Sequence, residues 1–273
     1  RVSRQTLHPI APEQSAAEPI HRLFHERLVD LPAGTYPGGR LQSFYVGQDF
    51  AFPGVTLGWN AFSTCRFRIN GVEYRDSVGD LFDAAHERLA PERLADAGGV
   101  TAHGDAHNAN VWFTERGLCL FDPAFAGANI PTLLAEVKAT FHNILAHPLW
   151  LYDPSDASAR FTASADYRDG VLDVTTSWAL PPVRRDILAV KASAFWRPLL
   201  ADLAARNMLL TDGRRVIRLA LFLCPTLVMN LRAGAGSHNP VSSLIGFSVA
   251  VMAGSEPVAG EDVVTAFLDG ISP

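Results

Sequence analysis

A polar run between two apolar, β-prone stretches constrains the fold of this chain more than any other feature of its 273 residues. Val100-Thr101-Ala102 precedes the run and Val111-Trp112-Phe113 follows it. Because both flanks favour extended and buried backbone, we expect His103 to Asn110 to form a loop held at both ends by the core. Polar loops mounted rigidly in this way often carry the chemistry of a protein.

Composition narrows the class of protein. Apolar residues make up 48% of the chain and charged residues 19%, which allows a sizeable core. A net charge of −5 argues against nucleic acid or an anionic membrane as partner. The three cysteines are far apart and form neither a disulfide framework nor a zinc spacing. With no signal peptide and no membrane-spanning stretch predicted, we expect a soluble, cytoplasmic protein.

Turn and capping signals organise the first half of the chain. Residues 1–14 contain several prolines and polar residues and are expected to form an extended arm. A capping-box pattern at Ser15 and Glu18 predicts a helix after it. Asn70-Gly71 predicts a β-hairpin, and Ser77 starts a second capped helix.

The second half of the chain is expected to be mostly helical. The polar run is followed by a hairpin whose turn is Thr114 to Gly117, and Asp122-Pro123 ends its second strand. Hairpins ahead of helices indicate an α+β fold dominated by helices. Segments 15–99 and 100–273 are expected to form one lobe. After Pro131 we expect helices at 131–146, about 182–206, about 213–231, 240–253 and 260–269.

Asp105, Asn110 and Asp122 have an order and spacing that suit phosphoryl transfer. In kinase-type transfer one Asp accepts the proton of the substrate hydroxyl, while an Asn and a second Asp hold Mg²⁺. Carboxylate oxygens are hard ligands that suit Mg²⁺. A neutral amide adds a ligand without further negative charge beside the phosphates. A simpler interpretation is that His103, Asp105 and Asn108 only satisfy backbone groups of a turn.

Two segments carry a resemblance to a known family. The run HGDAHNANVWF resembles the H-G-D-x-H-x-x-N-hydrophobic catalytic loop of the aminoglycoside phosphotransferase and choline kinase superfamily, which has a protein-kinase-like fold. LFDPAFAG is similar to the metal-binding segment of that family. The resemblance implies that Asp105 is the catalytic base and that Asn110 and Asp122 bind Mg²⁺. It also implies that His103 and His107 brace the loop, with ATP as phosphoryl donor and a small-molecule hydroxyl as acceptor.

The chain departs from this family in two places. An acidic residue normally supports the catalytic loop, and Glu136 is either a shifted substitute or an ordinary helix-surface residue. Lys138 and Lys191 are the only lysines, so none precedes Asp105 to contact the nucleotide phosphates from an N-terminal lobe. We therefore expect roughly 80–110 residues before Arg1 to supply that lobe. Without it, residues 1–273 should expose an apolar patch where the lobe docks.

Other functions remain open from the sequence. His103, Asp105 and His107, with His142 or His147, could hold zinc in a hydrolase, although the spacing is not that of a zinc-binding helix. The chain could also be a pseudokinase or a regulatory binding module.

The C-terminal helices are basic. Nine Lys or Arg residues against three Asp lie between Arg184 and Arg232. They either form solvated helix faces or line an acceptor cleft suited to a neutral or anionic hydroxyl compound. Arg232, among apolar residues, is a possible acceptor contact because a charge there needs a partner. Trp150, Trp178 and Trp196 are expected to anchor the core.

Overall fold

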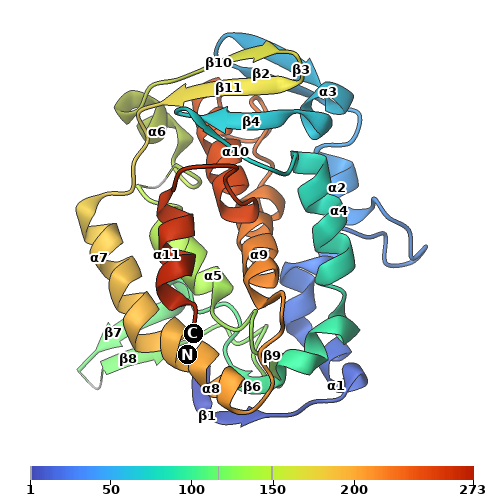
Figure 1. Ribbon diagram of the computed structural model, residues 1–273, viewed down its shortest axis with the longest axis vertical. Helices are drawn as coiled ribbons and strands as arrows, with labels where there is room; N and C mark the ends of the chain where they lie inside the picture. Colours follow the sequence, from blue (N-terminus) through green and yellow to red (C-terminus); the bar gives the residue numbers. More distant parts are fainter. Residues whose placement is uncertain (1, 116, 149) are drawn as a thin grey trace.

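Two small β-sheets lie at opposite ends of the protein, and helices fill the space between them (Figure 1). The structure is a computed structural model that describes residues 2–115, 117–148 and 150–273. Its elements form a mixed α+β fold in which helices predominate, as predicted. Each sheet is too small to be stable alone, so the helices that cover it supply the remaining apolar contacts.

The larger sheet has four strands in the order β10-β11-β4-β5, with the pair β11–β4 parallel and the others antiparallel. Asn70 and Gly71 form the β4–β5 turn at φ values of 48° and 87°, which confirms the predicted hairpin. The sequence analysis missed β10 and β11, although Asp169-Gly170 between them carries the same turn signal. The chain after Pro131 is therefore not all helical. The bounds are β4 (Arg66–Ile69), β5 (Val72–Glu73), β10 (Ala163–Arg168) and β11 (Val171–Thr176).

The smaller sheet holds one end of the polar loop. Its central strand β6 pairs antiparallel with β1 on one side and with β9 on the other. The predicted extended arm at 1–14 instead contains strand β1, whose backbone bonds to β6, and then helix α1. Strand β9 continues through Pro131, so the helix predicted at 131–146 begins only at Val137. The bounds are β1 (Val2–His8), β6 (Gly99–Ala102) and β9 (Gly127–Pro131).

Two further hairpins form separate two-stranded sheets, and the turn of the first bonds to β10 through the N–H of Ala165 and the carbonyl of Pro53. One consists of β2 (Asp49–Phe52) and β3 (Val55–Gly58), with Pro53-Gly54 as its turn. The other consists of β7 (Val111–Thr114) and β8 (Gly117–Leu120), which confirms the hairpin predicted after the polar loop.

The N-terminal helix differs from its prediction. The chain forms a short helix, α1 (Pro12–Ala16), and then the 3-10 turns η1 (Pro19–Leu23) and η2 (His25–Arg27). A proline disfavours helical backbone in the residue before it, and Glu18 before Pro19 has a ψ of 136°. The capping box predicted at Ser15 and Glu18 is therefore wrong. Their side chains bond to Pro91 and Asn129 instead.

Helix α10 lies at the centre of the molecule and packs against α9 (Figure 1). Its residues from Ser242 to Gly254 are all buried, which agrees with a sequence that is apolar on every face. Each predicted C-terminal helix is present, with altered ends. The remaining bounds are α2 (Gly39–Phe44), α3 (Trp59–Thr64), α4 (Val78–Arg88), η3 (Pro91–Ala97), η4 (Asn108–Asn110), α5 (Val137–Thr140), η5 (Phe141–Leu145), α6 (Pro154–Arg160), α7 (Pro182–Lys191), η6 (Ala192–Trp196), α8 (Arg197–Ala205), α9 (Gly213–Val228), α10 (Pro240–Gly254) and α11 (Val263–Ile271).

Buried apolar side chains from segments 15–99 and 100–273 form one contiguous core. Trp150, Trp178 and Trp196 are buried in it, as predicted. Within the described residues, every helix is too short or too polar to cross a lipid bilayer.

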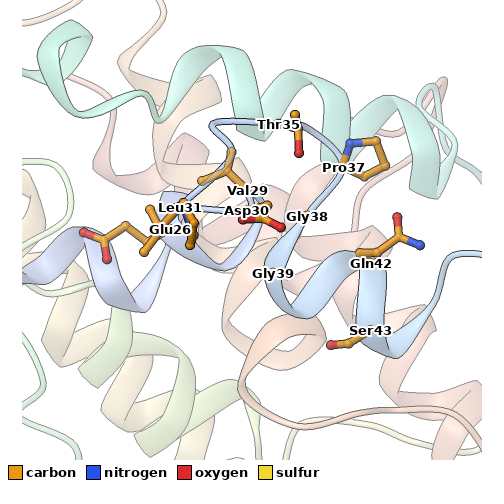
Figure 2. Close-up of a pocket in the computed structure, with 11 residues that line it drawn as sticks. Glu26, Val29, Asp30, Leu31, Thr35, Pro37, Gly38, Gly39, Gln42 and Ser43 are labelled. Carbon is orange, nitrogen blue, oxygen red and sulfur yellow. The ribbon is translucent and has the colours of Figure 1, made fainter.

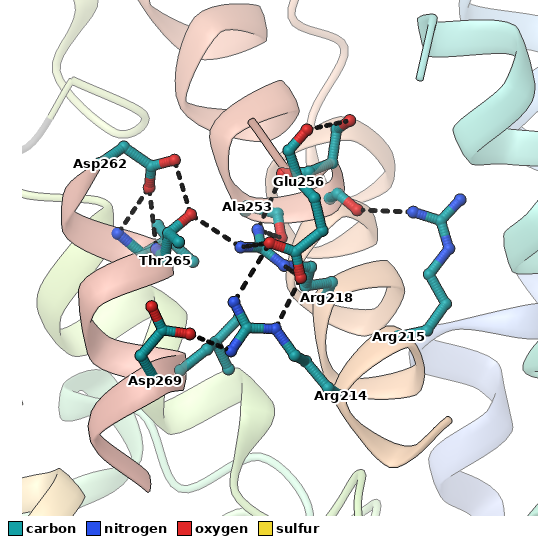
Figure 3. A network of polar contacts seen from close by, with 12 residues as sticks. Arg214, Arg215, Arg218, Ala253, Glu256, Asp262, Thr265 and Asp269 are labelled. Atoms are coloured by element: carbon teal, nitrogen blue, oxygen red, sulfur yellow. Dashed lines mark hydrogen bonds and ion pairs between the residues drawn. The ribbon is translucent and has the colours of Figure 1, made fainter. Parts of the chain in front are cut away.

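Arg218 of α9 links this helix to the end of α10 and to α11. Its guanidinium group is fully buried and donates to both carboxylate oxygens of Glu256, each at 2.8 Å (Figure 3). It also donates to the carbonyl of Ser255 and to the hydroxyl of Thr265 on α11. Arg214 reaches the same carboxylate from the half-exposed side of α9. Acidic partners within the fold therefore neutralise part of the positive charge that was predicted for these helices.

Replacing Arg218 with Met should destabilise the protein by about 3–5 kcal/mol, because several buried acceptors and Glu256 lose their partner. Replacing Arg214 with Met is the matched control. It should cost about 1 kcal/mol or less, since that pair is partly solvated. Urea unfolding followed by circular dichroism measures both, and equal losses would contradict the role assigned to Arg218.

Candidate functional site

The polar loop His103 to Asn110 connects β6 to β7, and its start depends on one glycine. Gly104 has a φ of 77°, a left-handed conformation that favours glycine. A Cβ atom at this position would lie 2.4 Å from the carbonyl oxygen of Phe125. Gly104 therefore lets the loop turn closely beneath the segment that follows β8.

His103 joins the loop to the end of the hairpin. Its Nε2 donates to the carbonyl of Phe121 at 2.9 Å, and its Nδ1 accepts from the backbone N–H of Asp105 at 3.4 Å. Both ring nitrogens are used within the protein. These contacts agree with the bracing role predicted for His103, and they place it behind Asp105.

Asp105 is a buried carboxylate with an unused oxygen. The residue is 9% exposed, and its Oδ1 is buried without a hydrogen-bond partner among the described residues. The ammonium nitrogen of Lys138 lies 3.9 Å from this oxygen, and Nε2 of His107 lies 3.8 Å from Oδ2. A buried polar atom without a partner is costly in a native protein. Such an atom is explained when a ligand supplies the missing hydrogen bond.

His107 is held by the loop itself. Its Nδ1 accepts from the backbone N–H of Ala109 at 3.2 Å, so the ring proton resides on Nε2, the nitrogen nearer Asp105. Burial lowers the pKa of His107, while the charge of Asp105 opposes this shift. A neutral imidazole thus borders the carboxylate.

Asn110 and Asp122 are brought to the same loop. The buried Asn110 donates from its amide nitrogen to the carbonyl of Asp105 at 2.9 Å. The amide oxygen is therefore the atom that could ligate a cation. The backbone N–H of Phe121 bonds to the carbonyl of Asn110 at 3.2 Å, which places Asp122 beside the loop. Asp122 is exposed and contributes to the electrostatics of His107.

These two side chains fit the ligand preferences of Mg²⁺. The ion favours oxygen ligands, keeps several waters and uses one or two carboxylates together with substrate phosphates. A fuller protein cage is not required. Among the described residues, no three or more His, Cys, Asp and Glu side chains converge on a metal position. That finding disfavours a zinc centre at His103, Asp105 and His107, as does the engagement of both nitrogens of His103.

Lys138 lies beside Asp105, a position that the sequence analysis did not predict. It comes from α5, is 4% exposed and donates to Nε2 of His142 at 2.9 Å. Nδ1 of His142 in turn bonds to the hydroxyl of Tyr152. Burial lowers the pKa of Lys138 and lowers that of His142 well below its usual value. A row of contacts therefore runs from Tyr152 at the surface through His142 and Lys138 to Asp105.

One feature of the sequence pointed to Lys138, although it did not reveal the partner of this lysine. The chain has two lysines, and this one stands within the apolar segment around α5, where a charge needs a reason. Only the contact between α5 and the loop reveals that reason, and it joins residues 33 positions apart along the chain.

Two arginines add positive charge near Asp105. Arg27 and Arg40 both donate to the carbonyl of Leu227 at the C-terminal end of α9, at 3.2 and 2.8 Å. Burial, followed by the charge of Arg40, lowers the pKa of Arg27 to about 10, and Asp105 opposes the shift. Both arginines also lower the pKa of Lys138. The three cations thus lie in the region of the buried Asp105, a field that suits phosphate groups.

Two other candidates have different partners from those expected. Glu136 is buried rather than on a helix surface, and its carboxylate pairs with Lys191 from α7. Arg232 donates to the backbone carbonyls of Phe44 and Asp49, which explains its charge by a structural role at the β2–β3 hairpin.

A cavity of about 650 Å³ lies elsewhere, between the loop 29–39 and helix α2 (Figure 2). Its charged lining residues are Glu26 and Asp30, and Asp30 already accepts the backbone N–H of Ala33. Two carboxylates without a cation in the lining repel phosphate groups. The glycines of this loop, Gly38 and Gly39, therefore do not form a phosphate-binding loop.

The hairpin beside the site exposes apolar side chains. Trp112, Phe113 and Leu118 are 65%, 84% and 73% exposed. The sequence analysis predicts an exposed apolar patch where an N-terminal lobe docks, and that docking stays a prediction.

Comparisons with known proteins add no family to this description. No protein-family model, no curated protein and no solved structure matches the chain.

Proposed function

We propose that the protein is an ATP- and Mg²⁺-dependent phosphotransferase that phosphorylates a hydroxyl group of a small molecule. The observation that carries the proposal is the buried, unpartnered Oδ1 of Asp105 facing Lys138. The resemblance of the surrounding loop and hairpin to the aminoglycoside phosphotransferase superfamily supports it. A protein-kinase-like fold is part of the same proposal.

Asp105 is the general base of this reaction. Its free oxygen accepts the proton of the acceptor hydroxyl as the hydroxyl oxygen attacks the γ-phosphorus of ATP. One oxygen–phosphorus bond forms, the bond from the γ-phosphorus to the bridging oxygen breaks, and ADP leaves. The loop contacts of His103 and Asn110 hold the carboxylate in position, which supplies much of the rate in such reactions.

Charge on the transferred phosphoryl group requires compensation. Asn110 and Asp122 would hold Mg²⁺, which neutralises phosphate charge when bound. Lys138 stands on the other side of Asp105 and supplies a fixed positive charge to the phosphoryl oxygens. A preorganised cation in a buried site stabilises developing negative charge more than the same cation in water.

The exposed hairpin β7–β8 fits the same proposal. Its apolar surface lies next to Asp122 and is suited to cover by the nucleotide base and by an N-terminal lobe. A pseudokinase or regulatory module would share this architecture without turnover.

Asp105→Asn should keep the fold and lower turnover roughly 10²-fold or more, because the amide cannot accept the hydroxyl proton. Steady-state release of ADP in the presence of an acceptor measures the effect. Turnover equal to that of the unmodified protein would refute the assignment of Asp105 as base.

Asn110→Ala and Asp122→Ala should each weaken Mg²⁺-dependent nucleotide binding, since each removes a proposed metal ligand. Calorimetry with Mg-ATP, and with ATP in chelator, separates the metal-dependent part. Asn108→Ala, one turn away on the same loop, is the matched control and should retain metal dependence. An unchanged metal dependence in both ligand variants would mean that the metal lies elsewhere.

Lys138→Met should lower kcat roughly 10²-fold with little change in the KM for ATP, because the cation acts on the transition state. Lys138→Arg should recover part of the loss, since it restores the charge. Lys191→Met removes the other lysine and should retain kcat. A merely structural role for Lys138 would instead give equal losses in the Met and Arg variants, together with a lowered unfolding temperature.

A further inference from the structure

A second cavity lies against the catalytic loop. It measures about 330 Å³ and is lined by residues of the loop, of η5 and of the segment after η5. This volume falls at the small end of the range typical of small-molecule sites, about 300–1,000 Å³. The lining residues are His107, Asn108, Ala109, His142, Asn143, His147 and Tyr152.

Two residues that line the cavity, His107 and His142, link it to the proposed base. His107 lines it and approaches Oδ2 of Asp105 at 3.8 Å. His142 lines it and bonds to Lys138, which stands 3.9 Å from Oδ1 of Asp105. A molecule in the cavity is therefore one side chain away from the carboxylate through His107, and two side chains away through His142 and Lys138.

Hydrogen-bonding capacity remains in the lining. Oδ1 of Asn143 accepts from the backbone N–H of Asn108 at 2.7 Å, which fixes the amide and leaves its NH₂ group to donate. A protonated Lys138 can only donate to Nε2 of His142, so the proton of that ring is on Nδ1, facing the Tyr152 oxygen. The Tyr152 hydroxyl hydrogen is then left for a ligand. The side chain of Asn108 adds a second amide.

The chemistry of the lining selects a class of ligand. Among the described residues that line the cavity there is no Asp and no Glu, so a polycationic amine would enter without a counter-charge in the lining. Burial also lowers the pKa of His142 and His147, which keeps these rings neutral near pH 7. Imidazole and phenol rings offer flat faces to the C–H groups of a sugar or cyclitol ring, while amides bond to its hydroxyl groups.

We infer that this cavity is the acceptor site and that it binds a neutral, polyhydroxylated molecule of about one ring, a monosaccharide or cyclitol. The inference rests on the proposed phosphotransfer, in which a hydroxyl of the bound molecule reaches past His107 to Asp105. It also explains why Asn143 is hydrogen-bonded both to the loop and to helix α7. Its carbonyl accepts from Arg184 of α7 at 2.7 Å in addition to the side-chain bond to Asn108.

Asn143→Asp is the sharpest test. The carboxylate still accepts from the N–H of Asn108, so the loop stays in place, but the donor is lost and a negative charge enters the cavity. Asn207→Asp makes the same change at an exposed position after α8 and is the matched control. Ligand-observed NMR with a panel of hexoses, pentoses and myo-inositol measures binding without any requirement for turnover.

We expect at least one neutral polyol of the panel to bind, and to bind at least 10-fold more weakly to Asn143→Asp than to Asn207→Asp. Absence of binding by every polyol, or equal binding by both variants, overturns the inference. Binding of a choline or aminoglycoside probe in preference to the polyols overturns it as well.

Turnover is measured separately with Mg-ATP and the same compounds. Phosphorylation of an amine-bearing acceptor alone, with no polyol bound, refutes the acceptor class while leaving the phosphotransferase proposal intact. Polyol binding that depends on Asn143, with no phosphoryl transfer to any compound, refutes the proposed function and leaves a polyol-binding site.

Discussion

The bond from His103 to the carbonyl of Phe121 holds together the two segments on which the site depends. One segment is the loop that carries Asp105 and Asn110, and the other is the strand end that carries Asp122. A second bond, from the N–H of Phe121 to the carbonyl of Asn110, closes the same connection from the other side. Because each bond uses backbone atoms of the hairpin, the relative position of the three polar side chains is set by main-chain geometry.

Burying Asp105 beside this connection creates an energetic problem that the rest of the fold has to solve. A carboxylate that leaves water needs a counter-charge or donors, and Lys138 at 3.9 Å is too far away for a hydrogen bond. In the proposed site, the desolvation of the Asp105 carboxylate destabilises the empty protein. A hydrogen bond from a ligand hydroxyl to Oδ1 offsets that free-energy cost when the ligand binds. Arg27 and Arg40, both fixed on the last carbonyls of α9, keep the local potential positive while that oxygen is unpaired.

Local signals predicted local structure well. Asn70-Gly71, the capping box at Ser77 and Asp80, and the alternation around Thr114 to Gly117 each specify their element from neighbouring residues alone. The failures occurred where a proline or a distant strand decided the outcome. Pro19 broke the helix expected after Ser15, and pairing with β6 kept residues up to Pro131 extended. The β10–β11 hairpin differs from these cases, because its turn, Asp169-Gly170, is a local signal that predicts a hairpin without any distant contact.

The candidate site divides along the same line. Asp105, Asn110 and Asp122 could be identified from their spacing, since one loop and one hairpin carry all three. Lys138, His142 and Tyr152 could not, because only tertiary packing brings α5 and η5 against the loop. For Arg232 the sequence suggested a functional contact, but its charge among apolar residues is explained by bonds to backbone carbonyls.

Lys138 also changes what the absence of an earlier lysine implies. A lysine on an N-terminal strand grips the nucleotide and acts mainly on its binding. A lysine beside the base lies where the phosphoryl group arrives, so it acts on the barrier to transfer. The two tasks are separable because they concern different phosphate oxygens at different stages of the reaction. In the proposed phosphotransferase, the first task belongs to a cation that grips the nucleotide. For the second, the helical part of the chain already holds a cation in place, fixed by His142 and facing Asp105.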